Sequence, residues 1–213
     1  PEVRRYLEMA VQKTNNQSFS EMLNQFEVRH GDAEKALETR EAELKADPEN
    51  PARHGALAEA YAAVATAKNI KGDEPGTMQF IQKAADVMSA ALEKWPDNLR
   101  FLMYYSDLSV TLKKTDDPEK RWQAYASGPG KTEPVKTALA ISGFYRKAGK
   151  SAESEATLRE ALKQQADKPD LLLQMALSQL LAAQEKYEDA LAAFSSGNLD
   201  RPEVMRSRVE LLL

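Results

Sequence analysis

The sequence predicts an all-α fold made of antiparallel helix pairs. Its 213 residues include 32 alanines and 24 leucines but only nine valines and three isoleucines. Unbranched side chains favour helices, whereas β-branched side chains favour strands. Turn and capping residues also recur at steps of 34 to 36 residues, which indicates a repeated helix-turn-helix unit.

The composition argues against several classes of function. There are 29 Lys+Arg against 33 Asp+Glu, so the net charge of −4 gives no general reason to bind nucleic acid or anionic lipid. Without cysteine there are no disulfides, thiolate nucleophiles or Cys-based zinc sites, and His30 and His54 lack a ligand partner at i+4. We therefore expect no metal or other cofactor. No uninterrupted apolar run approaches the roughly 18 residues of a membrane helix, which predicts a soluble protein.

In the first part of the chain, the sequence pattern predicts a partial unit over 1–16 and a repeat over 17–50. Residues 3–11 fit the second helix of a preceding pair. In the repeat, Ser18 and Glu21 have the spacing of a capping box. The remaining fit comes from Leu23, Gly31, Ala36, Leu44 and Pro48.

The next repeat, 51–98, contains about 14 residues more than its neighbours. We expect two overlong helices, roughly 52–70 and 75–94, joined by the turn-forming segment 71–76. Such a pair should project beyond shorter neighbours. The pattern that defines it consists of Leu57, Ala58, Tyr61, Ala84, Met88, Ala91, Leu92 and Pro96.

Two further repeats span 99–134 and 135–170. In the first, the second helix starts at Asp116 and is cut short by Gly128-Pro129-Gly130. In the second, Gly149 separates the two helices and Ser151 is placed to cap the second one. Four large aromatic side chains fall at positions expected to pack between helices: Trp95, Tyr105, Trp122 and Tyr145.

The most regular repeat is 171–204, followed by a partial unit over 205–213. A turn near Glu185-Lys186 separates its two helices, and Pro202 with Glu203 starts another helix. Because three leucines end the chain and terminal repeats normally present a polar surface, we expect a piece of a longer array. The apolar and small positions of this repeat are Leu173, Leu177, Ser178, Leu180, Leu181, Tyr187, Ala190, Leu191 and Phe194.

This 34-residue unit resembles a tetratricopeptide repeat (TPR). The resemblance is carried by Leu177-Ser178, Leu181, Tyr187, Ala190, Phe194 and Pro202. Gln174 and Gly197 depart from the family pattern, which has a large aromatic residue and an alanine there. For residues 1–213 the resemblance implies one right-handed superhelical α-solenoid of about five repeats with partial units at both ends. A non-repetitive helical bundle is the competing fold.

The resemblance also implies a concave face, lined by the first helix of each pair, that binds a peptide or helix of a partner protein. Helical phase relative to the buried positions places cations, an acid and thioether and aromatic groups there. We expect a partner with acidic and apolar side chains. The candidate partner-binding residues are Arg100, Met103, Tyr104, Asp107, Lys136, Arg146, Met175 and Gln179.

Some TPR proteins hold the C-terminal carboxylate of chaperones with five Lys, Asn and Arg side chains. At most one of the five matching positions agrees here, so the sequence argues against chaperone-tail binding. The matching positions, counted from the first repeat, are Met22, Gln25, Ala56, Arg100 and Tyr104.

The sequence contains none of the common catalytic motifs. There is no Gly-x-Ser-x-Gly, His-Glu-x-x-His or Walker-type loop, and the Gly130-Lys131-Thr132 segment lacks the first glycine of a phosphate loop. We therefore expect a non-catalytic protein-protein interaction module. Two alternatives stay open, namely a structural spacer or oligomerisation scaffold, and the recruiting arm of an enzyme whose catalytic domain lies outside these residues.

Overall fold

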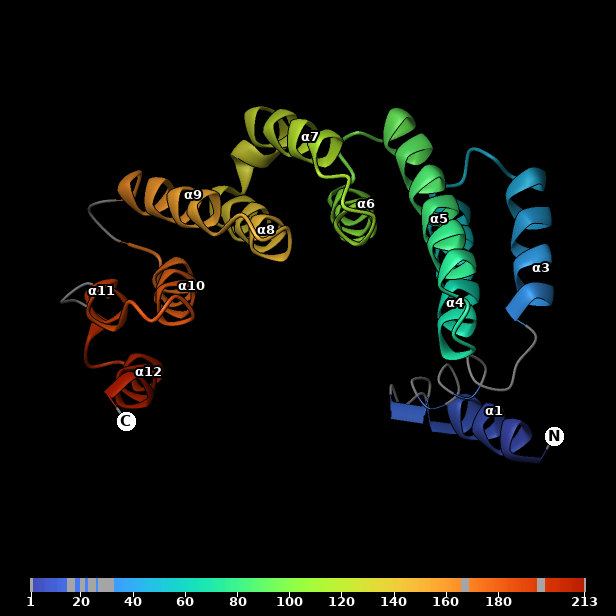
Figure 1. The fold of residues 1–213 in the computed structure, drawn as a ribbon, viewed down its shortest axis with the longest axis horizontal. Helices are drawn as coiled ribbons and strands as arrows, with labels where there is room; N and C mark the ends of the chain where they lie inside the picture. The colour runs from blue at the N-terminus through green and yellow to red at the C-terminus, as the bar shows by residue number, and fades with distance from the viewer. Residues whose placement is uncertain are drawn as a thin grey trace. The chain divides into compact units, whose positions relative to one another are not determined.

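The computed structural model of the chain describes residues 2–14, 18–19, 22, 26, 33–165, 169–194 and 198–212. Most of these residues are helical, and there is no strand among them (Figure 1). This confirms the predicted all-α class. By contact the chain divides into two compact units, Pro1–Leu112 and Lys113–Leu213. The continuity and handedness of the predicted solenoid stay a prediction.

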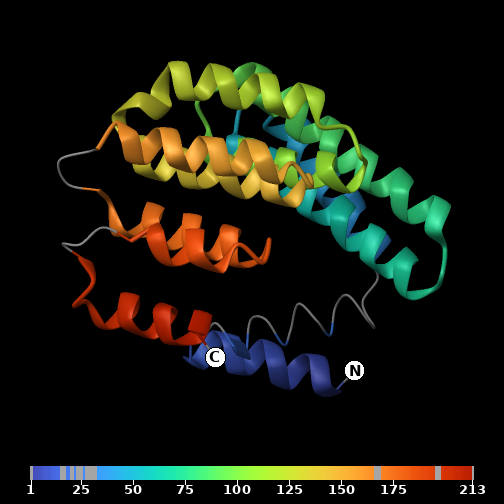
Figure 2. The ribbon, with the colours of Figure 1, turned by 60° about the vertical axis from the view of Figure 1, so that its left-hand side comes forward.

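The first unit is built around a long antiparallel helix pair. Its helices are α1 (Glu2–Thr14), α3 (Ala33–Ala46), α4 (Pro51–Ile70), α5 (Glu74–Lys94) and α6 (Leu99–Thr111). Figure 2 shows α4 and α5 running side by side to a tight connection. With 20 and 21 residues they are longer than the 13-residue α6 by about 10 Å of helix. The predicted pair of overlong helices is confirmed.

Both helices of the long pair begin at a side-chain cap. Asn50 Oδ1 accepts from the Ala52 amide at 3.0 Å, and Asp73 Oδ1 accepts from the Gly76 amide at 2.9 Å. The connection turns at Gly72, whose φ of +74° suits a residue without a Cβ atom. These caps fix where each helix starts, because they satisfy amides that the helix itself leaves free.

Small side chains let the helices of the first unit approach closely. Ala58 on α4 and Ala84 and Ala91 on α5 are completely buried, and Met88 fills the space beside them. Helix α3 packs against α4, and α6 packs against α5. The alanine-rich pattern of the sequence therefore corresponds to the helix contacts of this core.

The predicted residues of the first repeat, 17–50, lie partly outside the described residues. Glu21, Leu23, Gln25 and Gly31 are among those outside, and so is His30. The described part is α3, on which Leu37 is buried, and α1 confirms the helix expected over 3–11.

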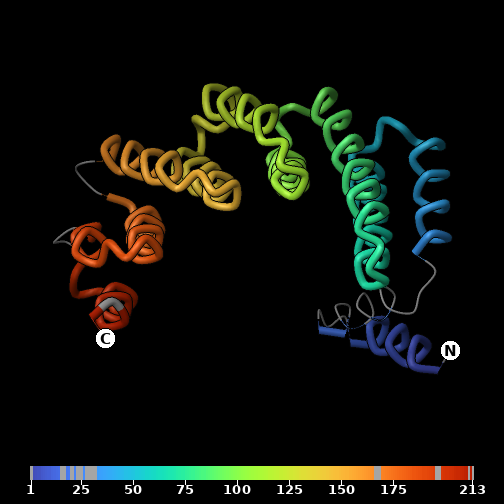
Figure 3. The backbone as a smooth tube through the Cα atoms, viewed as in Figure 1, coloured from blue at the N-terminus to red at the C-terminus, as the bar shows by residue number. Residues whose placement is uncertain are grey.

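The second unit contains two helix pairs and their flanking helices. Its elements are α7 (Asp116–Ser127), the 3-10 turn η1 (Pro129–Thr132), α8 (Pro134–Lys147), α9 (Ser151–Lys163), α10 (Leu171–Ala182), α11 (Tyr187–Ala192) and α12 (Pro202–Leu212). Helix α8 packs against α9, and α10 packs against α9 and α11 (Figure 3). The glycine-rich segment after α7 ends that helix, as predicted.

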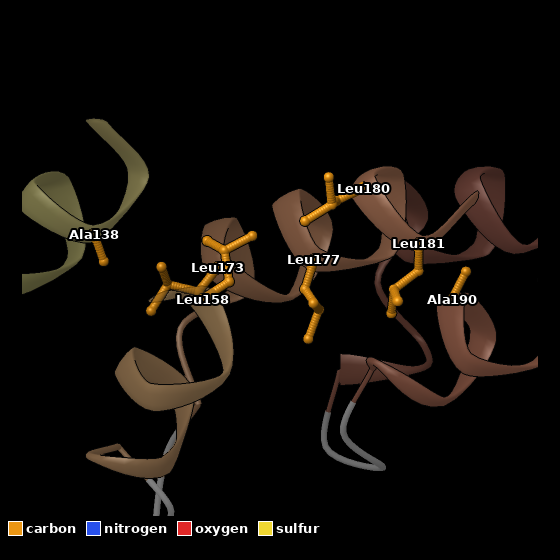
Figure 4. Close-up of a cluster of buried hydrophobic side chains, with 7 residues drawn as sticks. All are labelled: Ala138, Leu158, Leu173, Leu177, Leu180, Leu181 and Ala190. Carbon is orange, nitrogen blue, oxygen red and sulfur yellow. The ribbon is translucent and has the colours of Figure 1, made fainter. Parts of the chain in front are cut away.

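Seven apolar side chains from α8, α9, α10 and α11 form the core of the second unit (Figure 4). Leu158 and Leu173 are completely buried, as is Ala190 where α11 meets α10. Gln174, which departs from the TPR pattern, is 1% exposed and accepts a hydrogen bond from Asn198 Nδ2 at 3.1 Å. A polar pair thus occupies the place of the expected aromatic side chain.

The turn between α8 and α9 differs from the prediction in one respect. Gly149 has a φ of +74°, as its position between two helices requires. The prediction that Ser151 caps α9 is wrong, because the N-cap residue is Lys150 and no side chain makes a capping hydrogen bond. Lys150 instead pairs through Nζ with the Glu119 carboxylate on α7, to which Tyr145 also donates at 3.2 Å.

Candidate functional site

A groove of about 690 Å³ lies in the first unit, over α5 and between the first halves of α4 and α6. Its size is in the range of protein pockets that hold small ligands or short peptide segments. Residues from all three helices form its surface. The lining residues are Pro51, Ala52, Gly55, Glu59, Met88, Asn98, Arg100, Phe101, Met103, Tyr104 and Asp107.

Residues of α4 and α6 lie on the two sides of the groove. At one end the first residues of α4, Pro51 and Ala52, share the groove with Asn98, the N-cap residue of α6. Further along, the Tyr104 hydroxyl donates to the carbonyl oxygen of Ala58 at 3.5 Å. This contact joins the two walls of the groove.

The floor of the groove is apolar. Met88 on α5 is completely buried and belongs to the core beneath, against which Phe101 and Tyr104 also pack. Met103 is 46% exposed, so its thioether is available at the rim. A flexible thioether beside aromatic rings is an adaptable contact surface for an apolar side chain.

The end of the groove near the start of α4 is held by a chain of aromatic contacts. The His54 ring packs edge-on against Trp95, with centroids 5.1 Å apart, and Trp95 packs edge-on against Phe101 at 6.2 Å. Nε2 of His54 lies 2.9 Å from the Pro48 carbonyl oxygen, so this buried histidine has a structural role. These contacts preorganise the wall, which lowers the cost of ordering it on binding.

The groove carries charges of both signs. Among the described residues, neither Arg100 nor Glu59 has a hydrogen-bond or ion-pair partner, and both are exposed. Burial, together with the Glu59 charge, raises the pKa of Tyr104 to about 12. The phenol is therefore protonated at neutral pH and remains a hydrogen-bond donor at the groove.

The structure brings together half of the residues predicted for partner binding. Arg100, Met103, Tyr104 and Asp107 all line the groove of the first unit. Glu59 on α4 lines the same groove.

The other four predicted residues belong to the second unit. Lys136 and Arg146 lie exposed on α8, whereas on α10 Gln179 is exposed and Met175 half-buried. Lys136 Nζ lies 2.9 Å from a Glu133 carboxylate oxygen, which offsets its charge and weakens the basic character expected for this face.

Sequence reasoning missed several groove residues. Gly55 was overlooked because it has no side chain to contact a ligand. Met88 was overlooked because it fits the pattern of a core residue. Asn98 and Phe101 were not considered, although an Asn before an apolar helical run is a signal for an N-cap position. Gly55 itself was one further signal of a groove, because a glycine inside an alanine-rich helix leaves a gap on the helix surface.

The described residues contain no group of three or more His, Cys, Asp and Glu side chains placed to hold a metal ion. Within the same ranges, no helix has the length and apolar character needed to cross a membrane.

Comparison with known proteins gives structural similarity only. No family model matches the chain, and no curated protein matches its sequence. One similar solved structure is a thermophilic TPR protein from Thermus thermophilus, with 20% identity, a TM-score of 0.40, and coverage of 85% of this chain and 90% of that chain. Another is a tetratricopeptide repeat protein from Parabacteroides merdae, with 15% identity, a TM-score of 0.41, and coverage of 99% of this chain and 91% of that chain.

Proposed function

We propose that this chain is a non-catalytic protein-protein interaction module, and that the groove between α4 and α6 binds a segment of a partner protein. The observation that carries the proposal is an apolar floor flanked by Arg100 and Glu59, two exposed charges that have no ion-pair partner in the described part of the chain. Apolar floors supply binding energy, and unpaired rim charges supply orientation. The ring contacts from His54 through Trp95 to Phe101 hold the Phe101 side chain in place at the groove.

A charge reversal in the groove tests this proposal against a matched reversal outside it. Arg100→Glu changes a groove cation, and Lys120→Glu changes an exposed cation on α7. Neither of these two cations has an ion-pair partner among the described residues, so both variants should keep wild-type helicity. Proteins captured from the source lysate are then compared by mass spectrometry.

We expect partners to be retained by the wild type and by Lys120→Glu and to be lost by Arg100→Glu. Equal retention by all three proteins would contradict groove binding. The residues of the second unit are proposed as additional contacts, and Lys136→Glu and Arg146→Glu test them in the same experiment. Loss of partners in these two variants alone would place the binding surface on α8.

A second candidate function is that of a scaffold that binds by the tip of the long helix pair. Ile70 at the end of α4 is 61% exposed, and Met78 near the start of α5 is exposed as well. Exposed apolar side chains at a hairpin tip are a contact surface in their own right. In this case Ile70→Glu would abolish partner capture, whereas Arg100→Glu would leave it unchanged.

A further inference from the structure

The groove has a polarity along its length that restricts what it can bind. Arg100 lies in the first turn of α6, at the end shared with Asn98 and Pro51. Glu59 lines the groove directly after Ala58, whose carbonyl oxygen accepts from the Tyr104 hydroxyl at 3.5 Å, and Asp107 lies one turn beyond Tyr104 on α6. One end of the groove is thus cationic and the other is anionic.

The separation of these charges follows from helix geometry. Tyr104 is four residues and Asp107 seven residues beyond Arg100, which corresponds to about 6 and 10 Å along the axis at 1.5 Å per residue. The apolar surface of Phe101, Met103 and Tyr104 lies within that interval. An extended chain advances by about 3.3 Å per residue, so two to three residues of ligand span the same distance.

Building on the proposed function, we propose that the groove binds an extended peptide segment in which an acidic and a basic residue lie two or three positions apart, with a large apolar side chain between them. The acidic side chain faces Arg100, the apolar one lies on the Met88–Tyr104 floor, and the basic one faces Glu59 and Asp107. This proposed ligand differs from the acidic and apolar partner expected from the sequence, because it also carries a basic residue.

A helical ligand fits these features less well. Helices in grooves use apolar anchors repeated at i, i+3 or i+4, and i+7, over about two turns or 10 Å. Here the large apolar side chains of the floor are Phe101 and Tyr104, from one turn of α6, over the buried Met88, and both ends of the floor are charged. One large apolar side chain between two charges is the pattern of a short extended segment.

Fluorescence anisotropy with labelled synthetic peptides tests the inference on the full chain. The probes are Ala-Glu-Phe-Leu-Lys-Ala and the reversed order Ala-Lys-Phe-Leu-Glu-Ala, since the charges do not fix the direction of the chain. The controls replace both charged residues by Glu, by Lys or by Gln. We expect one bipolar peptide to bind about threefold to tenfold more tightly than every control, which corresponds to one or two exposed charge pairs.

Charge exchange between protein and peptide makes the test specific. Arg100→Glu should prefer the peptide with two lysines, and Glu59→Lys should prefer the peptide with two glutamates. The matched reversal Lys120→Glu should leave the ranking of the peptides unchanged. In each variant the changed preference means tighter binding of a peptide that the wild type binds weakly. A misfolded protein cannot produce such a gain of affinity.

Two results would overturn the inference. One is binding of neither bipolar peptide, and the other is an equal affinity for bipolar and control peptides. If Arg100→Glu still loses captured partners in the lysate experiment, groove binding stands while the bipolar ligand fails. If Arg100→Glu keeps those partners, the proposed function fails as well, so the two failures are distinguishable.

Discussion

Replacing Gly55 by alanine is a sharp test of the groove wall. Gly55 is the fifth residue of α4, and a Cβ atom built on it would lie 3.7 Å from Cε1 of Phe101. That distance is ordinary van der Waals contact, so the methyl group fits without strain. Alanine is favoured over glycine inside a helix by about 1 kcal/mol. We therefore expect Gly55→Ala to raise the free energy of unfolding of the first unit by about 0.5–1 kcal/mol.

The chain offers a matched control and separate reporters for this measurement. Gly143 lies inside α8, where an added Cβ atom would meet nothing within 4 Å, so Gly143→Ala should give a similar gain in the second unit. The chain has two tryptophans, Trp95 in the first unit and Trp122 in the second. Urea unfolding followed by fluorescence in single-tryptophan backgrounds reports each unit separately. A loss of stability in Gly55→Ala with a gain in Gly143→Ala would refute the described spacing between α4 and Phe101.

Three further predictions concern packing and pH. Met88→Ala should lower the free energy of unfolding by about 2–5 kcal/mol because this side chain is completely buried, whereas Met103→Ala at the exposed rim should change it by less than about 0.5 kcal/mol in urea titrations. Gly130→Ala should destabilise the second unit by about 1–3 kcal/mol, since a Cβ atom there would lie 2.8 Å from the Thr137 hydroxyl and 2.9 Å from the Tyr125 carbonyl oxygen, and wild-type stability would contradict this. The Lys150 ammonium lowers the pKa of the Glu119 carboxyl, so this pair stabilises the fold above the ordinary carboxyl pKa, and the gain is lost as the pH falls through the lowered value. Glu119→Gln should therefore flatten the dependence of stability on pH between about pH 6 and pH 3, and unchanged curves would show that the pair contributes nothing.

The helices of this protein could be predicted because their signals are local. The starts of α4 and α5 follow Asn50 and Asp73, whose side chains cap the helices in the structure and are of the types favoured at that position. The positive φ of Gly149 was also predictable, since a tight connection between two helices requires it. Signals of this kind depend on a few neighbouring residues and not on the rest of the fold.

The groove could be predicted only in part. Helical phase placed Arg100, Met103, Tyr104 and Asp107 on one face of α6, and that face lines the groove. Met88 was assigned to the core because its pattern is apolar, and it is completely buried there, but it also lines the groove. The groove depends on packing between helices that are far apart in the sequence, which no local pattern encodes.

Side-chain pairing was the other limit of prediction. Lys136 was expected to contribute a free positive charge, but Glu133, one turn before it, lies within 2.9 Å. Lys150 precedes α9 as its N-cap residue in place of Ser151, and its side chain pairs with Glu119 on α7. A long charged side chain can reach several partners whose ion pairs differ little in free energy. Its pairing therefore depends on the final positions of the helices.

Site-specific photo-crosslinking tests most directly the claim that the groove is the partner-binding surface. A photoreactive amino acid is placed at Met103 in the groove or at Met78 near the tip of the long pair, both exposed methionines of the first unit. We predict that partner proteins in the source lysate crosslink from position 103 and not from position 78. Crosslinking from position 78 alone would contradict the account and identify the tip of the long pair as the binding surface.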